Sequence, residues 1–224
     1  MDWTAAVDAY CERTNESFWA EPLNAWSNLA FFAASVIGLS LWSLRGGRDR
    51  IGLILCLLVA VIGAGSFLFH TFATRWASLA DIIPIALFIY IYFALALSRF
   101  FGFSWVAAGL GTAAFLAVSL ISQPLLAPIA GSSAGYVPAL LAMLVIGGIL
   151  ARQGGHAGPI VLGAGLTFLA SLSLRTLDGP LCGVWPLGTH VFWHFLNAAT
   201  LGLLLAAAID AFPASDRRPF VAHS

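Results

Sequence analysis

The chain has 224 residues, of which 60% are hydrophobic and only 9% are charged. Soluble domains contain about 45–50% apolar and about 25% charged residues, so this composition excludes an ordinary soluble globule. The same hydrophobicity excludes a disordered chain. Ten arginines, with no lysine, balance ten acidic residues, so no basic patch for nucleic acid is expected. The expected partner is the lipid bilayer, and nothing in the composition implies a protein partner.

A membrane-spanning helix needs about 20 mostly apolar residues to cross about 30 Å of hydrocarbon, and seven stretches approach that requirement. They are Pro22–Leu44, Ile51–Phe72, Leu79–Leu97, Phe103–Ile121, Gly135–Ala151, Gly158–Leu174 and His190–Ala211. We therefore predict an all-α integral membrane protein, a bundle of seven transmembrane helices. An N-terminal segment over residues 1–21 precedes this domain of residues 22–211, and a tail over 212–224 follows it.

The arginines predict which way the bundle faces. Seven of them fall on one side of the predicted spans and three on the other. The seven are Arg45, Arg48, Arg50, Arg99, Arg152, Arg217 and Arg218, and the three are Arg13, Arg75 and Arg175. Because cytoplasmic loops carry an excess of basic residues, the C-terminus is expected in the cytoplasm and the N-terminus outside.

Four ionisable residues fall at membrane depth, where such groups are rare and mark functional sites. His70 ends the second stretch, Asp81 opens the third, and His190 and His194 open the seventh, so all four are expected in the outer leaflet. The i, i+4 spacing places His190 and His194 on one helix face. Three histidines with an open position for water are a common catalytic zinc set. Asp81 is then either a fourth ligand or the group that holds the water.

Ser66 precedes His70 by one helical turn and shares its face. Its hydroxyl either bonds to the backbone of its own helix or donates to a developing oxyanion.

The N-terminal segment is rich in oxygen-bearing side chains, among them Glu12, Asn15 and Glu21. Carboxylate and amide oxygens suit Ca²⁺, but there is no EF-hand pattern, and composition alone favours a solvated acidic face. Cys11 and Cys182 are both predicted outside, which permits a disulfide in an oxidising compartment and equally leaves two unpaired thiols.

Three blocks of sequence resemble the alkaline ceramidases. The first is Tyr10-Cys11-Glu12 with Ala20-Glu21-Pro22-Leu23-Asn24-Ala25-Trp26-Ser27-Asn28, the second Gly65-Ser66-Phe67-Leu68-Phe69-His70 followed by Asp81-Ile82-Ile83-Pro84, and the third His190-Val191-Phe192-Trp193-His194. That family belongs to a superfamily of seven-span hydrolases that includes the adiponectin-receptor and progestin-receptor-like proteins. The blocks occur in the family's order, and the chain looks like a bacterial-type member.

The resemblance implies a zinc ion held by His70, His190 and His194, with Asp81 and Ser66 beside it. It implies an amide hydrolase that splits ceramide, or a related long-chain N-acyl lipid, into a sphingoid base and a free fatty acid. Asp81 is then expected as general base and Ser66 as oxyanion donor, in the outer leaflet of a bacterial inner membrane.

The resemblance also implies a disulfide between Cys11 and Cys182, and a Ca²⁺ ion close to the zinc, bound by the N-terminal segment. Glu12, Asn15 and Glu21 are the candidate calcium ligands. The sequence departs from the family here, because Tyr10 stands where the family has tryptophan and one extra residue separates the first two candidates.

Three alternative functions remain open from the sequence. The first is a seven-span lipid receptor or sensor with a zinc site and little or no turnover, since the superfamily includes receptor-like proteins. The second is a transporter or proton channel. Such proteins carry ionisable groups at successive depths across the membrane, whereas those predicted here cluster in one leaflet. The third is a structural membrane protein in which the zinc only joins helices.

Overall fold

The computed structural model describes residues 2–212, and within them all regular structure is helical. The elements in chain order are α1 (Pro22–Ser27), α2 (Leu29–Leu44), α3 (Arg50–Phe72), α4 (Arg75–Phe101), α5 (Trp105–Ala130), the 3₁₀ helix η1 (Gly131–Tyr136), α6 (Val137–Arg152), α7 (Ala157–Leu181) and α8 (His190–Asp210). The all-α prediction is confirmed. Most of the predicted tail, with Arg217 and Arg218, lies outside the described residues.

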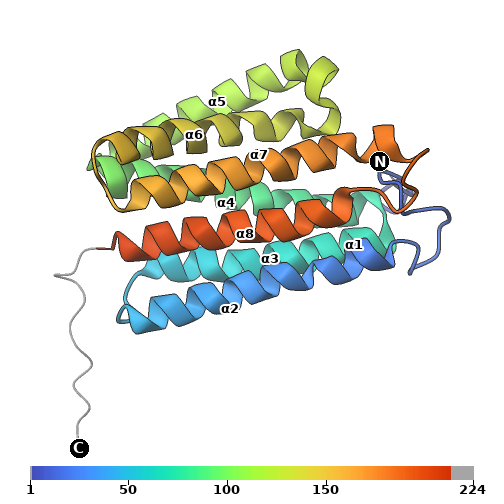
Figure 1. Ribbon diagram of the computed structural model, residues 1–224, viewed down its shortest axis with the longest axis horizontal. Helices are drawn as coiled ribbons and strands as arrows, with labels where there is room; N and C mark the ends of the chain where they lie inside the picture. Colours follow the sequence, from blue (N-terminus) through green and yellow to red (C-terminus); the bar gives the residue numbers. More distant parts are fainter. Residues whose placement is uncertain (1, 213–224) are drawn as a thin grey trace, which may run out of the picture.

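The long helices pack lengthwise into one bundle with α8 at its centre (Figure 1). α8 contacts α2, α3, α4 and α7. Buried apolar side chains from these helices, such as Leu55, Leu95 and Leu205, form the main core. His190 and His194, the predicted histidine pair, lie on this central helix. Their side chains therefore come from the most buried of the spanning helices described.

Six helical runs are long and apolar enough to cross a membrane. They are Pro22–Leu44, Arg50–Phe72, Arg75–Phe101, Trp105–Arg152, Ala157–Leu181 and His190–Asp210. The fourth run contains both α5 and α6, which fold back on each other at η1 (Figure 1). Each of the seven predicted stretches therefore contains a helix, and the lengths show a membrane protein. Large apolar side chains such as Val36, Leu120 and Ile129 are exposed on its exterior, as contact with lipid requires.

Three helices extend beyond their predicted ends. α4, α5 and α7 continue to Phe101, Ala130 and Leu181, whereas the predicted stretches end at 97, 121 and 174. The predictions stopped at polar residues, such as Arg99 and Arg175, that apolar patterning places outside a span. Both guanidinium groups have partners on other helices or loops, so the helical backbone continues through them.

Charged groups close one end of the bundle. The Asp49 side chain accepts a hydrogen bond from Gly52 N at the start of α3, which satisfies one of the free N–H groups there. Arg99 donates to both carboxylate oxygens of Asp49, at 2.7 and 3.0 Å, and to the carbonyl of Ala208 at 2.6 Å. Arginine therefore joins α3, α4 and α8 at the end predicted to face the cytoplasm.

The N-terminal segment lies across the opposite end. Its backbone pairs with the turn between α3 and α4, where Val7 N donates to Ala73 O at 2.7 Å and Arg75 N to Ala5 O at 3.1 Å. A disulfide between Cys11 and Cys182 joins the same segment to the end of α7. The segment is thereby held over the end of the bundle that carries the histidines.

Candidate metal centre

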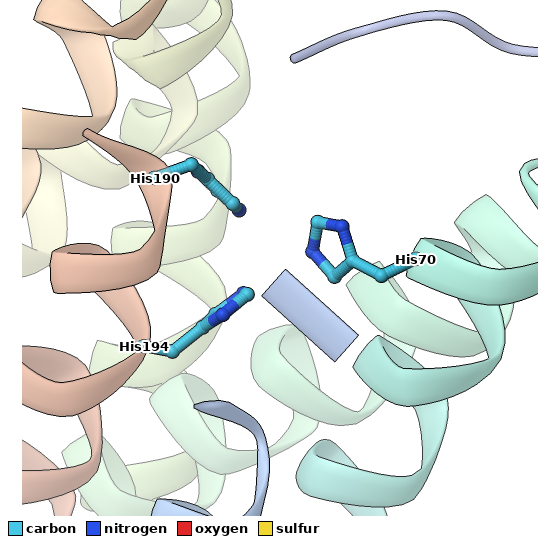
Figure 2. A group of neighbouring side chains, drawn as sticks. All are labelled: His70, His190 and His194. Atoms are coloured by element: carbon cyan, nitrogen blue, oxygen red, sulfur yellow. The ribbon is translucent and has the colours of Figure 1, made fainter. Parts of the chain in front are cut away.

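Three histidine rings converge between α3 and α8. Figure 2 shows His70 on α3 pointing toward His190 and His194 on α8. Each ring offers one nitrogen, and these nitrogens lie within 4.8 Å of one another. The three residues are at most 2% exposed. This buried group could hold a metal ion, as the sequence predicts, and the fold alone leaves the element open.

Glu21 determines which nitrogen of His70 is free. Burial opposes its charge, but hydrogen bonds from His70, Arg13 and Asn24 hold the pKa of Glu21 below its usual value. An ionised carboxylate only accepts hydrogen bonds, so His70 Nδ1, 2.6 Å from Glu21 Oε2, carries the proton. Metal-binding histidines usually have such a partner on the second nitrogen.

Ser27 determines which nitrogen of His194 is free. Its hydroxyl donates to the carbonyl of Asn24 at 2.9 Å, which uses its only hydrogen. The 2.6 Å contact between Ser27 Oγ and His194 Nδ1 must then have the imidazole as donor. His194 Nε2 is left as an unprotonated nitrogen that faces the site.

Two buried ring nitrogens have no hydrogen-bond partner among the described residues. They are His70 Nε2 and His190 Nδ1. A buried polar atom without a partner costs free energy, and native proteins rarely leave one unsatisfied. Unpartnered nitrogens on rings held in fixed orientation fit a metal site, because neutral imidazole is the form that binds metal.

The two predicted catalytic residues lie beside the histidines. Ser66 Oγ is 3.4 Å from His194 Nε2. The carboxyl group of Asp81 interacts with the Ser66 hydroxyl and lies within electrostatic range of His70. Asp81 is not among the converging ligand atoms, which come from the three histidines alone in the described chain. This geometry favours a group that acts on water over a fourth ligand.

A close helix contact sets the position of Asp81. A Cβ atom on Gly65 of α3 would overlap the carbonyl oxygen of Ala80 on α4, so only glycine permits this approach. Pro84 lies four residues after Ala80 and has no N–H to donate to that carbonyl. Gly65 and Pro84 together allow the α4 backbone at Asp81 to pack against α3. The contact is at Gly65, the residue before Ser66.

Sequence reasoning missed Asp178, which is 2% exposed. Its carboxylate accepts from Thr189 N at 2.6 Å and from His190 N at 2.9 Å, at the start of α8. It also accepts from Cys11 N at 3.0 Å. Asp178 thus joins the disulfide to the helix that carries two of the histidines. No local pattern signals this role, since Cys11 is 167 residues away.

Each of the three candidate calcium ligands has a hydrogen-bond partner within the chain. Both oxygens of Glu12 accept backbone N–H groups, from Leu23 at 2.7 Å and Asn24 at 2.8 Å. Asn15 is exposed, and its side-chain oxygen accepts from a nearby backbone N–H group. Glu21 Oε1 is bound by Arg13 Nε at 2.6 Å. These oxygens therefore have partners within the chain, and the calcium site stays a prediction.

Arg13 supplies the positive charge in that region. Its side chain is buried, and it donates to Glu21 Oε1, to the carbonyl of His70 at 3.1 Å and to the carbonyl of Asn15 at 3.2 Å. The guanidinium group therefore binds the same carboxylate that orients His70.

A cavity of about 510 Å³ is lined by Tyr10, Asp81 and Arg175 among other residues. Tyr10 lies between the cavity and the histidines. Its side chain lines the cavity, and its ring stacks on His190 with a centroid distance of 3.6 Å. Burial raises the pKa of the Tyr10 phenol well above its usual value, so it stays neutral. Asp81 and Arg175 are the only charged residues in the described lining.

A second, apolar cavity of about 60 Å³ continues toward the bundle interior. It shares Ile85 and Ile89 with the larger cavity. Its other walls come mainly from aliphatic and aromatic side chains, such as Phe88 and Leu201. The two neighbouring cavities thus offer polar groups at Asp81 and apolar walls between the helices, the two kinds of surface that an amphiphile contacts.

Comparison of the chain with protein-family models gives no match, and comparison with curated proteins gives none either.

Proposed function

We propose that this protein is a zinc-dependent intramembrane amide hydrolase that cleaves ceramide or a related long-chain N-acyl lipid into an amine, such as a sphingoid base, and a free fatty acid. The observation that carries the proposal is the meeting of three buried histidines with Asp81 and Ser66 beside a cavity that has polar and apolar walls. The resemblance of the same residues to the alkaline ceramidases supports it.

Zinc is the metal that the donor set favours, because three imidazoles leave a tetrahedral position for water or substrate. His70, His190 and His194 would hold it, and when bound it supplies a hydroxide nucleophile at neutral pH and polarises a carbonyl. Glu21 and Ser27 keep the two ring protons away from the site.

The residues beside the histidines divide the proton and charge transfers between them. Asp81 accepts the proton of the attacking water as its oxygen bonds to the amide carbonyl carbon. The Ser66 hydroxyl donates a hydrogen bond to the oxygen on which negative charge develops. Asp81 then returns the proton to the amide nitrogen as the C–N bond breaks, which releases the fatty acid and the amine.

The proposed membrane arrangement has seven spans, with α5 and α6 as separate crossings. The N-terminal segment is outside, and the site lies in the outer leaflet of a bacterial inner membrane. Seven arginines on the other side of the predicted bundle support this orientation. The acyl chain lies in the apolar cavity, and the lipid enters sideways from the bilayer.

The test is metal content and hydrolysis measured on one preparation. The protein is purified in detergent, its metals are quantified by mass spectrometry, and it is incubated with a fluorescent ceramide with and without a chelator. About one zinc per chain and chelator-sensitive release of fatty acid are expected. Zinc without release of fatty acid from ceramide or other N-acyl lipids would favour the receptor alternative, and absence of bound metal would overturn the proposal.

A further inference from the structure

Arg175 is a cation in the cavity without an ion-pair partner. Its Nη1 donates to Ser132 Oγ at 3.0 Å and Ser133 Oγ at 2.9 Å, and its Nη2 donates to Tyr10 Oη at 3.3 Å. The guanidinium also lies over the rings of Tyr136 and Trp193, 5.3 and 5.5 Å from their centroids. All of these partners are neutral, and none of the four salt bridges in residues 2–212 involves Arg175.

A charge in this position needs a functional explanation. Ionisable groups at membrane depth are expensive and normally pair with one another or line a path for a substrate. Arg175 shares the cavity with Asp81, yet the two do not form an ion pair. Arg13, a buried arginine at the same end, is paired with Glu21. Arg175 is therefore available to a negative group that enters the cavity.

We propose that Arg175 binds the anionic head group of the substrate, and that the substrates are N-acyl amino acid lipids. In such a lipid a fatty acyl chain is joined through an amide to a fragment that carries a carboxylate. The planar guanidinium suits a carboxylate because its parallel N–H groups match the two oxygens. This inference rests on the proposed function and specifies the substrate class within it.

The guanidinium of Arg175 and the histidine group lie close together, and these are the two places that would contact the carboxylate and the amide of the substrate. Tyr10 contacts both Arg175, through its hydroxyl, and His190, through its ring. The amide and the carboxylate of an N-acyl amino acid are likewise separated by a short spacer. The carboxylate reaches Arg175, the amide lies near the histidines and Asp81, and the acyl chain extends between Ile85 and Ile89.

The reaction balances without another reagent. The oxygen of one water bonds to the acyl carbon, the C–N bond breaks, and the amide nitrogen gains one proton. The products are a fatty acid and a free amino acid. The carboxylate bound to Arg175 takes no part in the bond changes and leaves with the amine.

The first experiment compares two substrates that differ in one charge, N-oleoylglycine and the neutral N-oleoylglycinamide. We expect the zinc-loaded protein to favour the acid about tenfold or more in kcat/KM, mainly through a lower KM. Arg175→Gln should abolish that preference, because kcat/KM for the acid falls far more than kcat/KM for the neutral amide. Arg152→Gln removes an exposed arginine from the end of α6 and should retain the preference.

Equal losses on both substrates in Arg175→Gln would indicate a structural role and overturn the proposal, as would a wild-type protein without preference. Arg175→Lys serves where the glutamine variant does not fold. Lysine keeps the charge but loses the planar fork, so the preference should fall and remain measurable. A lysine variant without any preference, in folded protein, would also count against the proposal.

The second experiment measures binding to metal-depleted protein in phosphatidylcholine nanodiscs by calorimetry. N-oleoylglycine should bind about tenfold or more tightly than the glycinamide, and only with Arg175 present. Such binding without hydrolysis of any amide would keep the anion site and reject the proposed function. Ceramide hydrolysis without this binding would reject the anion site alone. Tighter binding of a phosphate-headed N-oleoyl lipid would replace the amino acid class by a phosphorylated one.

Discussion

At the scale of single residues, the neighbours of the histidines matter as much as the histidines. Glu21 and Ser27 each fix the position of one ring proton. Glu21 Oε2 is 2.6 Å from His70 Nδ1, and Ser27 Oγ is 2.6 Å from His194 Nδ1. Such partners orient the ring and raise its affinity for metal. A site with its tautomers determined before metal arrives needs little rearrangement when the ion binds.

Asp81→Asn should separate metal binding from chemistry. The variant keeps the three histidines, so zinc content should be unchanged, whereas turnover should fall by about 10²-fold or more because the base is lost. His194→Ala should lose both zinc and turnover. The checks are metal analysis and a lipid-amide assay on the same samples. Full activity in folded Asp81→Asn would reject Asp81 as the base.

Arg13 is a reason to expect that the histidine site does not depend on calcium. Because its guanidinium binds the carboxylate that orients His70, neither Ca²⁺ nor a calcium-selective chelator should change Tm or activity. Arg13→Gln leaves the charge of Glu21 without its cation and should weaken zinc affinity about tenfold or more. Zinc titration of metal-depleted protein measures this effect. Activation of the wild type by Ca²⁺ would contradict the prediction.

The sequence predicts the histidines of the candidate site better than it predicts the residues that hold them in place. His190 and His194 are recognisable because i, i+4 spacing puts them on one face, and span order brings His70 to the same leaflet. Arg13, Ser27 and Asp178 act across 57 to 167 residues of sequence. Contacts of that kind depend on how helices and loops pack, which local patterns do not specify.

At the scale of helices, apolar patterning places the seven stretches well and their ends poorly. α4 and α7 extend past their predicted ends because Arg99 and Arg175 find partners in the folded bundle. The contact between α3 and α4 at Gly65 is a second feature that patterning does not reveal. Here the absence of a side chain at Gly65 brings the Asp81 carboxyl group close to the Ser66 hydroxyl.

Gly65→Ala should reduce turnover more than it reduces metal binding. The new methyl group overlaps the Ala80 carbonyl, so α4 must move and carry Asp81 away from Ser66. We expect a loss of about tenfold or more in kcat, since misplacement by about 1 Å is costly in catalysis. Gly148→Ala is the matched control, because a Cβ atom there meets nothing within 4 Å. Equal activity of both variants would contradict the argument.

At the scale of the whole molecule, the disulfide between Cys11 and Cys182 closes a loop of 171 residues. It holds the N-terminal segment, with Glu21 and Arg13, over the histidine end. A loop of this size corresponds to about 5 kcal/mol of stabilisation in the chain-entropy model. The bond therefore supports both the bundle and the contacts that orient His70.

Reduction of the disulfide should lower Tm and zinc affinity together. Thermal unfolding and zinc titration in detergent, with and without reductant, measure the two effects. Cys56→Ala is the control, since Cys56 is the remaining cysteine and lies buried in the core. The variant should respond to reductant as the wild type does. An unchanged Tm after complete reduction would show that the segment is held by its other contacts alone.

The order of synthesis gives the placement of the histidines a further consequence. His70 is made early, within α3, but His190 and His194 belong to α8, the last helix of the bundle. During insertion into the membrane the nascent chain therefore has one imidazole in place long before the other two. The full set of three rings exists only once α8 has been made, so an ion held by all three would bind only after that point.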